Sequence, residues 1–299
     1  MQSECARRAA EIPRQARDDS NGVRDQRPVP SLPDAVREVV AAFSARPEVV
    51  AIALGGSVAS GAVDASSDHD IYILTTADIP HEVRRQLAMR FDPAPEIGNA
   101  WFGEGDEWSD RSAGVSVDLM YWDQKWFEGQ LRDVIERHQP SLGYTTSLWF
   151  TARHARPLFD RDGWFAGIQA LAASPYPEEL RESIVGWNRP LLRSTRSSYR
   201  HQIELAIARD DPVSVNHRIA ALLASVFDIV FASMRAPHPG EKRLLDHVAR
   251  LGTPVPDEFA PLVRRVLAAT GDPAVRQVLT ALDELCDVVD EIVRRTDPG

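Results

Sequence analysis

A glycine turn and two carboxylates lie close together in the first third of the chain. Gly55, Gly56 and Ser57 follow a short β-branched run at 49–54, which predicts a buried strand. Glycines after a strand let backbone N–H groups approach a phosphate closely, and a helix beginning near Ser57 would add a hydroxyl and a favourable dipole. This turn is therefore a candidate phosphate-binding site.

Asp68 and Asp70 are two positions apart, at the start of a second apolar run at 71–74. On an extended chain such residues share one face. Carboxylates this close repel each other by a few kcal/mol at an effective dielectric near 20, unless a cation lies between them. Asp118, in the alternating run 115–121, would bring a third carboxylate to the same edge of the sheet. Three carboxylates and triphosphate oxygens suit Mg²⁺, so these three acids are predicted metal ligands.

The spacing of these residues resembles the signature of the nucleotidyltransferase superfamily. That superfamily includes DNA polymerase beta, the kanamycin and streptomycin adenylyltransferases and small bacterial antitoxin-type transferases. Its pattern is a hydrophobic residue before Gly-Gly/Ser-Ser, then Asp-x-Asp between hydrophobic residues, and a third acid on a later strand. The matching residues here are Gly56, Ser57, Asp68, Asp70 and Asp118.

The resemblance covers about residues 50–123 and implies a reaction. An acceptor hydroxyl would attack the α-phosphorus of a nucleoside triphosphate in line, and pyrophosphate would leave. Of two Mg²⁺ ions, one would activate the nucleophile and the other would bind the triphosphate and leaving group. The helical C-terminal half is similar to the antibiotic-modifying members in architecture alone.

A catalytic base is expected in the acidic segment upstream of Asp118, where some antibiotic adenylyltransferases place a glutamate. Asp118 itself could also serve through the metal. Glu96 and Glu107 are the favoured catalytic candidates among the acids of this segment, which are Glu96, Glu104, Asp106, Glu107 and Asp110.

Cations that could meet the triphosphate come from the second half of the chain. Lys242 lies at the start of a predicted helix at 240–251 and is a candidate for the β- or γ-phosphate. A series of arginines at helical spacing could line the same cleft, although such a series is also typical of a solvated helix face. Its members are Arg189, Arg193, Arg196 and Arg200.

The elements that must position these residues indicate an α+β protein. A small mixed sheet with flanking helices at 31–174 would carry the acids, and a helical bundle at 175–299 would follow the break at Ser174-Pro175-Tyr176-Pro177. Residues 94–114 lack a clear period and predict loop or irregular strand, and residues 1–30 predict a disordered tail. The bundle helices are expected at 178–209, 213–235, 240–251, 257–270 and 273–295.

The amino-acid composition argues against some kinds of binding partner. The net charge of −10 and pI near 5.3 argue against a large nucleic-acid surface, which normally needs a basic face. Cys5 and Cys286 at opposite ends of the chain indicate neither a disulfide framework nor a metal site. No run approaches the ~18 apolar residues of a membrane span, so we expect a cytoplasmic protein with no membrane partner.

The sequence thus predicts a nucleotidyltransferase that moves a nucleoside monophosphate, AMP from ATP as the first choice, to a small hydroxylated acceptor. An acidic surface would suit a cationic acceptor, and antibiotic modification is one such activity. Two alternatives stay open: nucleotidylation of a protein or tRNA in a toxin–antitoxin-like system, and a catalytically silent nucleotide-binding module. The oligomeric state is not predicted.

Overall fold

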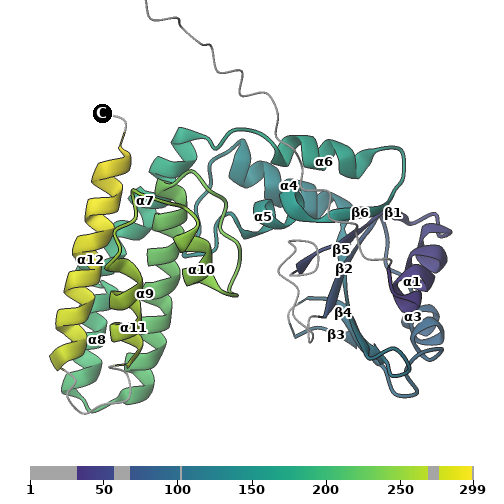
Figure 1. Cartoon of the computed structure of the whole chain (residues 1–299), viewed down its shortest axis with the longest axis horizontal. Coiled ribbons are helices and arrows are strands. Elements are labelled where there is room, and N and C mark those ends of the chain that lie inside the picture. The colour runs from purple at the N-terminus through teal and green to yellow at the C-terminus, as the bar shows by residue number, and fades with distance from the viewer. Residues whose placement is uncertain (1–31, 57–67, 102, 269–275, 298–299) are drawn as a thin grey trace, which may run out of the picture. The chain divides into compact units, whose positions relative to one another are not determined.

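A computed structural model describes residues 32–56, 68–101, 103–268 and 276–297 (Figure 1). Residues 33–299 group into one compact unit. The predicted N-terminal tail, Ser57 and the helix expected after it lie outside the described residues. The predicted domain boundary at 174/175 stays a prediction.

The described strands form one mixed six-stranded sheet in the order β3-β4-β5-β2-β1-β6. Strand β2 runs parallel to β5, and every other neighbouring pair is antiparallel. This confirms the predicted fold class of a small mixed sheet followed by helices. The bounds are β1 Val49–Leu54, β2 His69–Thr75, β3 Glu96–Asn99, β4 Gly105–Asp110, β5 Val115–Asp123 and β6 Arg156–Asp160.

Strands β3 and β4 form in the segment that the sequence predicted as loop or irregular strand. Strand β4 is polar, yet it pairs along its whole length with β5. Its buried Asp106 accepts hydrogen bonds from Arg84 Nη2 at 2.7 Å and Tyr121 Oη at 2.7 Å. A carboxylate satisfied in this way can be buried in a strand without the apolar period that marks most strands. Strand β6 was also missed by the sequence analysis.

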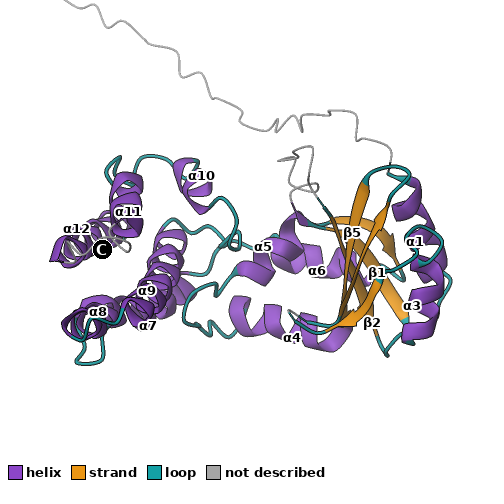
Figure 2. Ribbon diagram, turned by 90° about the horizontal axis from the view of Figure 1, so that it is seen from below, coloured by secondary structure: helices purple, strands orange, loops and turns teal. Residues whose placement is uncertain are grey.

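Helices cover both faces of the sheet (Figure 2). Helices α1 and α3 lie on one side, where Phe43 and Arg84 contact the ring of Tyr121. Helices α4, α5 and α6 lie on the other, where Phe127, Trp149 and Phe165 pack with the sheet in one apolar cluster. The bounds are α1 Asp34–Ser44, α3 His81–Ala88, α4 Gln124–Ile135, α5 Ser147–His154 and α6 Trp164–Ala172.

The second half of the chain is helical, as predicted, and has its own apolar core. The expected helix 178–209 is two helices, because Ser198 caps a new one by accepting a hydrogen bond from the backbone N–H of His201. The expected helix 240–251 is shorter and begins at Leu244. The bounds are α7 Glu178–Arg193, α8 Tyr199–Ala208, α9 Pro212–Ser233, α10 Leu244–Ala249, α11 Phe259–Ala268 and α12 Arg276–Thr296.

Helix α9 is the most apolar of these helices. By length and composition it could span a membrane, with a mean hydropathy of 1.5 over its most apolar 18 residues. However, 67% of that window is buried, and Ile219, Leu222, Val226 and Val230 belong to the bundle core. A buried core helix needs the same apolar composition, so α9 is explained by packing in the bundle.

A buried carboxyl links α9 to the loop before α5. Asp228 accepts hydrogen bonds from the backbone N–H of Thr145 at 3.0 Å and from its hydroxyl at 2.6 Å. Burial raises the pKa of Asp228 to about 7, although the two hydrogen bonds act in the opposite direction. The folded protein therefore binds a proton at Asp228 at a pH where the unfolded chain has released it.

The raised pKa of Asp228 should make the free energy of unfolding depend on pH. Because the folded pKa is the higher one, the contribution of Asp228 to stability is present below about pH 4 and is lost as the pH rises through 7. Asparagine resembles the protonated acid and does not titrate. We therefore expect the stability of Asp228→Asn, measured relative to wild type, to rise by about 1–4 kcal/mol as the pH goes from 4.5 to 8. Urea unfolding of both proteins at these two pH values measures the difference. A difference that does not change with pH would contradict the shift.

Candidate active site

Four acids lie side by side across four neighbouring strands. Asp70 on β2 pairs with Asp118 on β5, Asp118 pairs with Glu107 on β4, and Glu107 pairs with Glu96 on β3. Residues in register on adjacent strands project to the same face of a sheet. We name this set, Glu96, Glu107, Asp118 and Asp70, the acidic row. The structure thus brings together acids that the sequence placed in three separate segments.

Burial and neighbouring charges shift the pKa of Asp118 and of Asp70, the two acids at the β2 end of the acidic row. Burial raises the pKa of Asp118 to about 6, and the negative charges of Asp70, Glu107 and Asp68 add to this effect. Burial also raises the pKa of Asp70, with a further contribution from Asp68. Such a site resists holding all of its negative charge without a cation. Asp68 is itself exposed, just before the start of β2.

The glycine turn packs directly against the acids. Gly56 has φ +62°, and a Cβ built on it would lie 1.6 Å from Oδ2 of Asp70. The backbone N–H of Gly55 donates to the carbonyl of Asp70 at 2.8 Å. The space beside Gly56 is therefore filled by the Asp70 carboxylate, which no other residue type at position 56 would allow. The glycine joins the predicted phosphate-binding turn to the predicted metal ligand.

Tyr72 is a site residue that the sequence analysis missed. A Cβ on Gly55 would lie 2.1 Å from Cε2 of Tyr72, so Gly55 is required by this ring. The Thr151 side chain and the Gly56 backbone lie close enough to the Tyr72 hydroxyl to lower its pKa, against the larger raising effect of burial. Its ring stacks on Trp122 at 4.5 Å between centroids. Burial and the nearby acids raise the pKa of Tyr72, so the phenol stays protonated.

The position of Tyr72 was open to sequence reasoning, because it is two residues after Asp70 on the same strand and shares its face. The proximity of Tyr72 to Thr151 could not be predicted in this way, because the sequence analysis did not predict helix α5. Trp122 lies between the rings of Tyr72 and Phe127.

Three of the five candidate bases are held by hydrogen bonds from Arg84 or Ser112, and a fourth, Glu107, accepts a longer hydrogen bond from Asn99 Nδ2 at 3.3 Å. Glu104 accepts a hydrogen bond from Arg84 Nη1 at 2.8 Å, and Asp106 accepts one from Arg84 Nη2. Asp110 accepts hydrogen bonds from the hydroxyl and backbone N–H of Ser112. Glu107 and Glu96 are in the acidic row and exposed. Strands are about 4.8 Å apart, which puts Glu96 about 14 Å from Asp70 along the sheet and leaves Glu107 beside Asp118.

Lys242 is the cation that the structure brings toward the acids. Its charge lowers the pKa of both Asp70 and Asp118, against the raising effect of burial. Lys242 is exposed and lies in the turn before α10 rather than in a helix. Its predicted contact with the outer phosphates stays a prediction.

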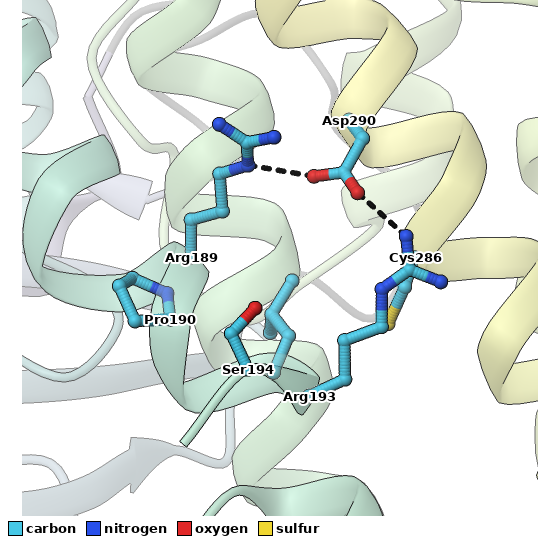
Figure 3. Close-up of a pocket in the computed structure, with 7 residues that line it drawn as sticks. Arg189, Pro190, Arg193, Ser194, Cys286 and Asp290 are labelled. Carbon is cyan, nitrogen blue, oxygen red and sulfur yellow. Dashed lines mark hydrogen bonds and ion pairs between the residues drawn. The ribbon is translucent and has the colours of Figure 1, made fainter.

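The arginine series does not line this site. Arg189 and Arg193 both pair with Asp290 of α12, at 2.6 Å in each case (Figure 3). Arg200 pairs with Asp283, also of α12, at 3.2 Å. Arg189 and Arg193 border a cavity of about 310 Å³ within the bundle. The helical spacing of these arginines therefore reflects ion pairs between α7, α8 and α12, which is the alternative interpretation of the pattern.

The donor set fits a magnesium ion that also binds phosphate. In the part of the chain that the structure describes, no three His, Cys, Asp or Glu side chains form a ready-made metal site. Mg²⁺ is usually held by one or two carboxylates together with substrate phosphates and water, not by a complete protein cage. The adjacent, partly buried carboxylates of Asp70 and Asp118 match this requirement.

Comparisons with known proteins add little to this geometry. No protein-family model matches the chain, and no curated protein matches it. The chain is similar to a solved structure of a nucleotidyltransferase-like protein from Exiguobacterium sibiricum 255-15, with a TM-score of 0.44 and 12% identity over 88% of this chain and 77% of that one. A likeness at this level says nothing about the reaction, so the site residues stand on their own geometry.

Proposed function

We propose that the protein is a nucleotidyltransferase, which transfers AMP from ATP, or the corresponding group of another nucleoside triphosphate, to a hydroxyl of a small acceptor. The observation that carries the proposal is the registered pair of Asp70 and Asp118 with the glycine turn packed on the Asp70 carboxylate. A turn that can bind phosphate and two acids on neighbouring strands are the parts that a metal–triphosphate complex requires.

Each part has a role in this proposal. Asp70 and Asp118, with Asp68 beside them, hold the metal ions, and the glycine turn of Gly55 and Gly56 binds the phosphates. A phosphate-binding role for Ser57, which lies outside the described residues, stays a prediction from the sequence. Mg²⁺ ions would polarise the phosphoryl oxygens and neutralise the charge that develops on the leaving pyrophosphate. Lys242 attracts the outer phosphates, and Glu107 accepts the proton of the acceptor hydroxyl.

The acceptor in this proposal is a small hydroxylated molecule with cationic groups. Glu107 and Glu96 extend the acidic row away from Asp118 and are exposed, so an acceptor on that side meets negative charge. An antibiotic with amino and hydroxyl groups has this chemistry. We place the reaction in the cytoplasm, where nucleoside triphosphates are available.

Release of pyrophosphate tests the proposal. Wild type is incubated with Mg²⁺, each labelled nucleoside triphosphate and a panel of aminated and neutral polyols. We expect acceptor-dependent release that Asp118→Asn reduces by about 100-fold or more, because the variant loses a metal ligand. Asp78→Asn is the matched control, since Asp78 is exposed beyond the opposite end of β2. Equal release by wild type and Asp118→Asn would refute the metal role, and binding without turnover would favour a silent module.

A further inference from the structure

A buried histidine anchors the loop that carries Lys242. His238 is 0% exposed, and its backbone N–H donates to the Thr146 hydroxyl at 2.7 Å. Two residues further on, the backbone N–H of Gly240 donates to Nδ1 of His238 at 3.1 Å. Lys242 is two positions after Gly240. The start of this loop therefore has one hydrogen bond within the loop and one to the segment before α5.

The His238 ring is suited to this role because it is neutral. Burial lowers the pKa of His238 to about 4, and the charge of His247 acts in the same direction. A neutral ring whose Nδ1 accepts a hydrogen bond carries its proton on Nε2. The rings of Tyr144 and Phe231 contact the imidazole edge-on, with centroids at 4.9 and 5.0 Å. The imidazole is thus packed against two aromatic rings.

Thr146 connects this anchor to the acids of the active site. Its neighbour Thr145 is held by Asp228 of α9. Helix α5 begins directly after Thr146 and carries Thr151, whose side chain lies close enough to the Tyr72 hydroxyl to lower its pKa. The same short segment therefore supports the glycine turn through α5 and the Lys242 loop through His238.

We propose that Thr146 and His238 are positioning residues that hold Lys242 over the triphosphate site. The proposal rests on the nucleotidyltransferase function given above. Without the anchor, residues 238–243 would lose the hydrogen bonds that fix their start, and Lys242 would spend less time near the acids. A contact made equally by bound substrate and transition state changes KM and leaves kcat unaltered. The anchor should therefore act on the affinity for the triphosphate.

A double-mutant cycle on Thr146 and Lys242 tests this. Thr146→Val keeps the shape and removes the hydroxyl, whereas Thr146→Ser keeps the hydroxyl. The Thr146 hydroxyl makes no capping hydrogen bond to α5, so neither variant removes a helix cap. We expect Lys242→Gln to weaken binding of Mg²⁺–ATP, measured by calorimetry, by about 10-fold, and Thr146→Val by about 5-fold. Thr146→Ser should bind within about 2-fold of wild type, and Thr146→Val should add almost nothing to Lys242→Gln.

Hydrogen exchange of the Gly240 amide gives a second readout that does not involve the nucleotide. Its exchange should be faster in Thr146→Val than in wild type and normal in Thr146→Ser and Lys242→Gln. Additive losses in the cycle, or unchanged binding by Thr146→Val, would overturn the positioning role while leaving the proposed function intact. If wild type binds no triphosphate, the proposed function fails, and unchanged Gly240 exchange in Thr146→Val would show separately that the anchor is absent.

Discussion

Replacing Asp70 with asparagine is expected to reduce nucleotidyl transfer by about 1000-fold while leaving the melting temperature unchanged or higher. Asparagine fills the same space above Gly56, where Oδ2 of Asp70 takes the place of a side chain. It cannot supply the charge that a metal ion needs, and the loss of metal-based stabilisation costs several kcal/mol in the transition state. At 1.36 kcal/mol for each factor of ten, a loss near 4 kcal/mol gives this reduction.

The expected gain in stability has a separate cause. Burial and the charge of Asp68 raise the pKa of Asp70, so ionisation of this carboxyl costs the metal-free fold stability relative to the unfolded chain. Asparagine removes that charge. Thermal unfolding and pyrophosphate release on the same preparations measure both effects, with Asp78→Asn as the control that changes neither. An active Asp70→Asn protein, or one that has lost both activity and fold, would contradict this account of the site.

Changing Gly56 to alanine should lower activity by about 100-fold and stability by about 1–3 kcal/mol. Alanine at φ +62° is strained, and its Cβ would collide with the Asp70 carboxylate at 1.6 Å. The turn or the carboxylate must therefore move. A displacement of about 1 Å at a catalytic group is enough to cost this much in rate. Measurements of kcat/KM and of urea unfolding report the two losses.

Gly163→Ala is the matched control for this change. Gly163 also has a positive φ, +74°, but nothing lies within 4 Å of a Cβ built there. It should show a stability loss of about 1 kcal/mol from backbone strain and normal activity. If the two variants behave alike, strain alone accounts for the effect at position 56, and the contact between Gly56 and Asp70 has no functional weight.

The sequence alone was enough for the local parts of the site. Periodicity located the strands at 49–54 and 71–74, because side chains that alternate or are continuously apolar report burial directly. The spacing of Asp68 and Asp70 placed both on one face, and the same argument extends to Tyr72. The sequence alone therefore nominates the acids of the candidate site without knowledge of their neighbours.

Only the tertiary structure decided which segments meet. The register that puts Asp70 beside Asp118 depends on the parallel pairing of β2 and β5. The polar strand β4 forms because Arg84, distant in sequence, satisfies Asp106. The loop that carries Lys242 is held by a hydrogen bond between His238 and Thr146, whereas Arg189 and Arg193 form ion pairs with α12. Local patterns report how deeply a residue is buried and on which face it lies, but pairing between distant segments depends on long-range hydrogen bonds and packing that no local pattern contains.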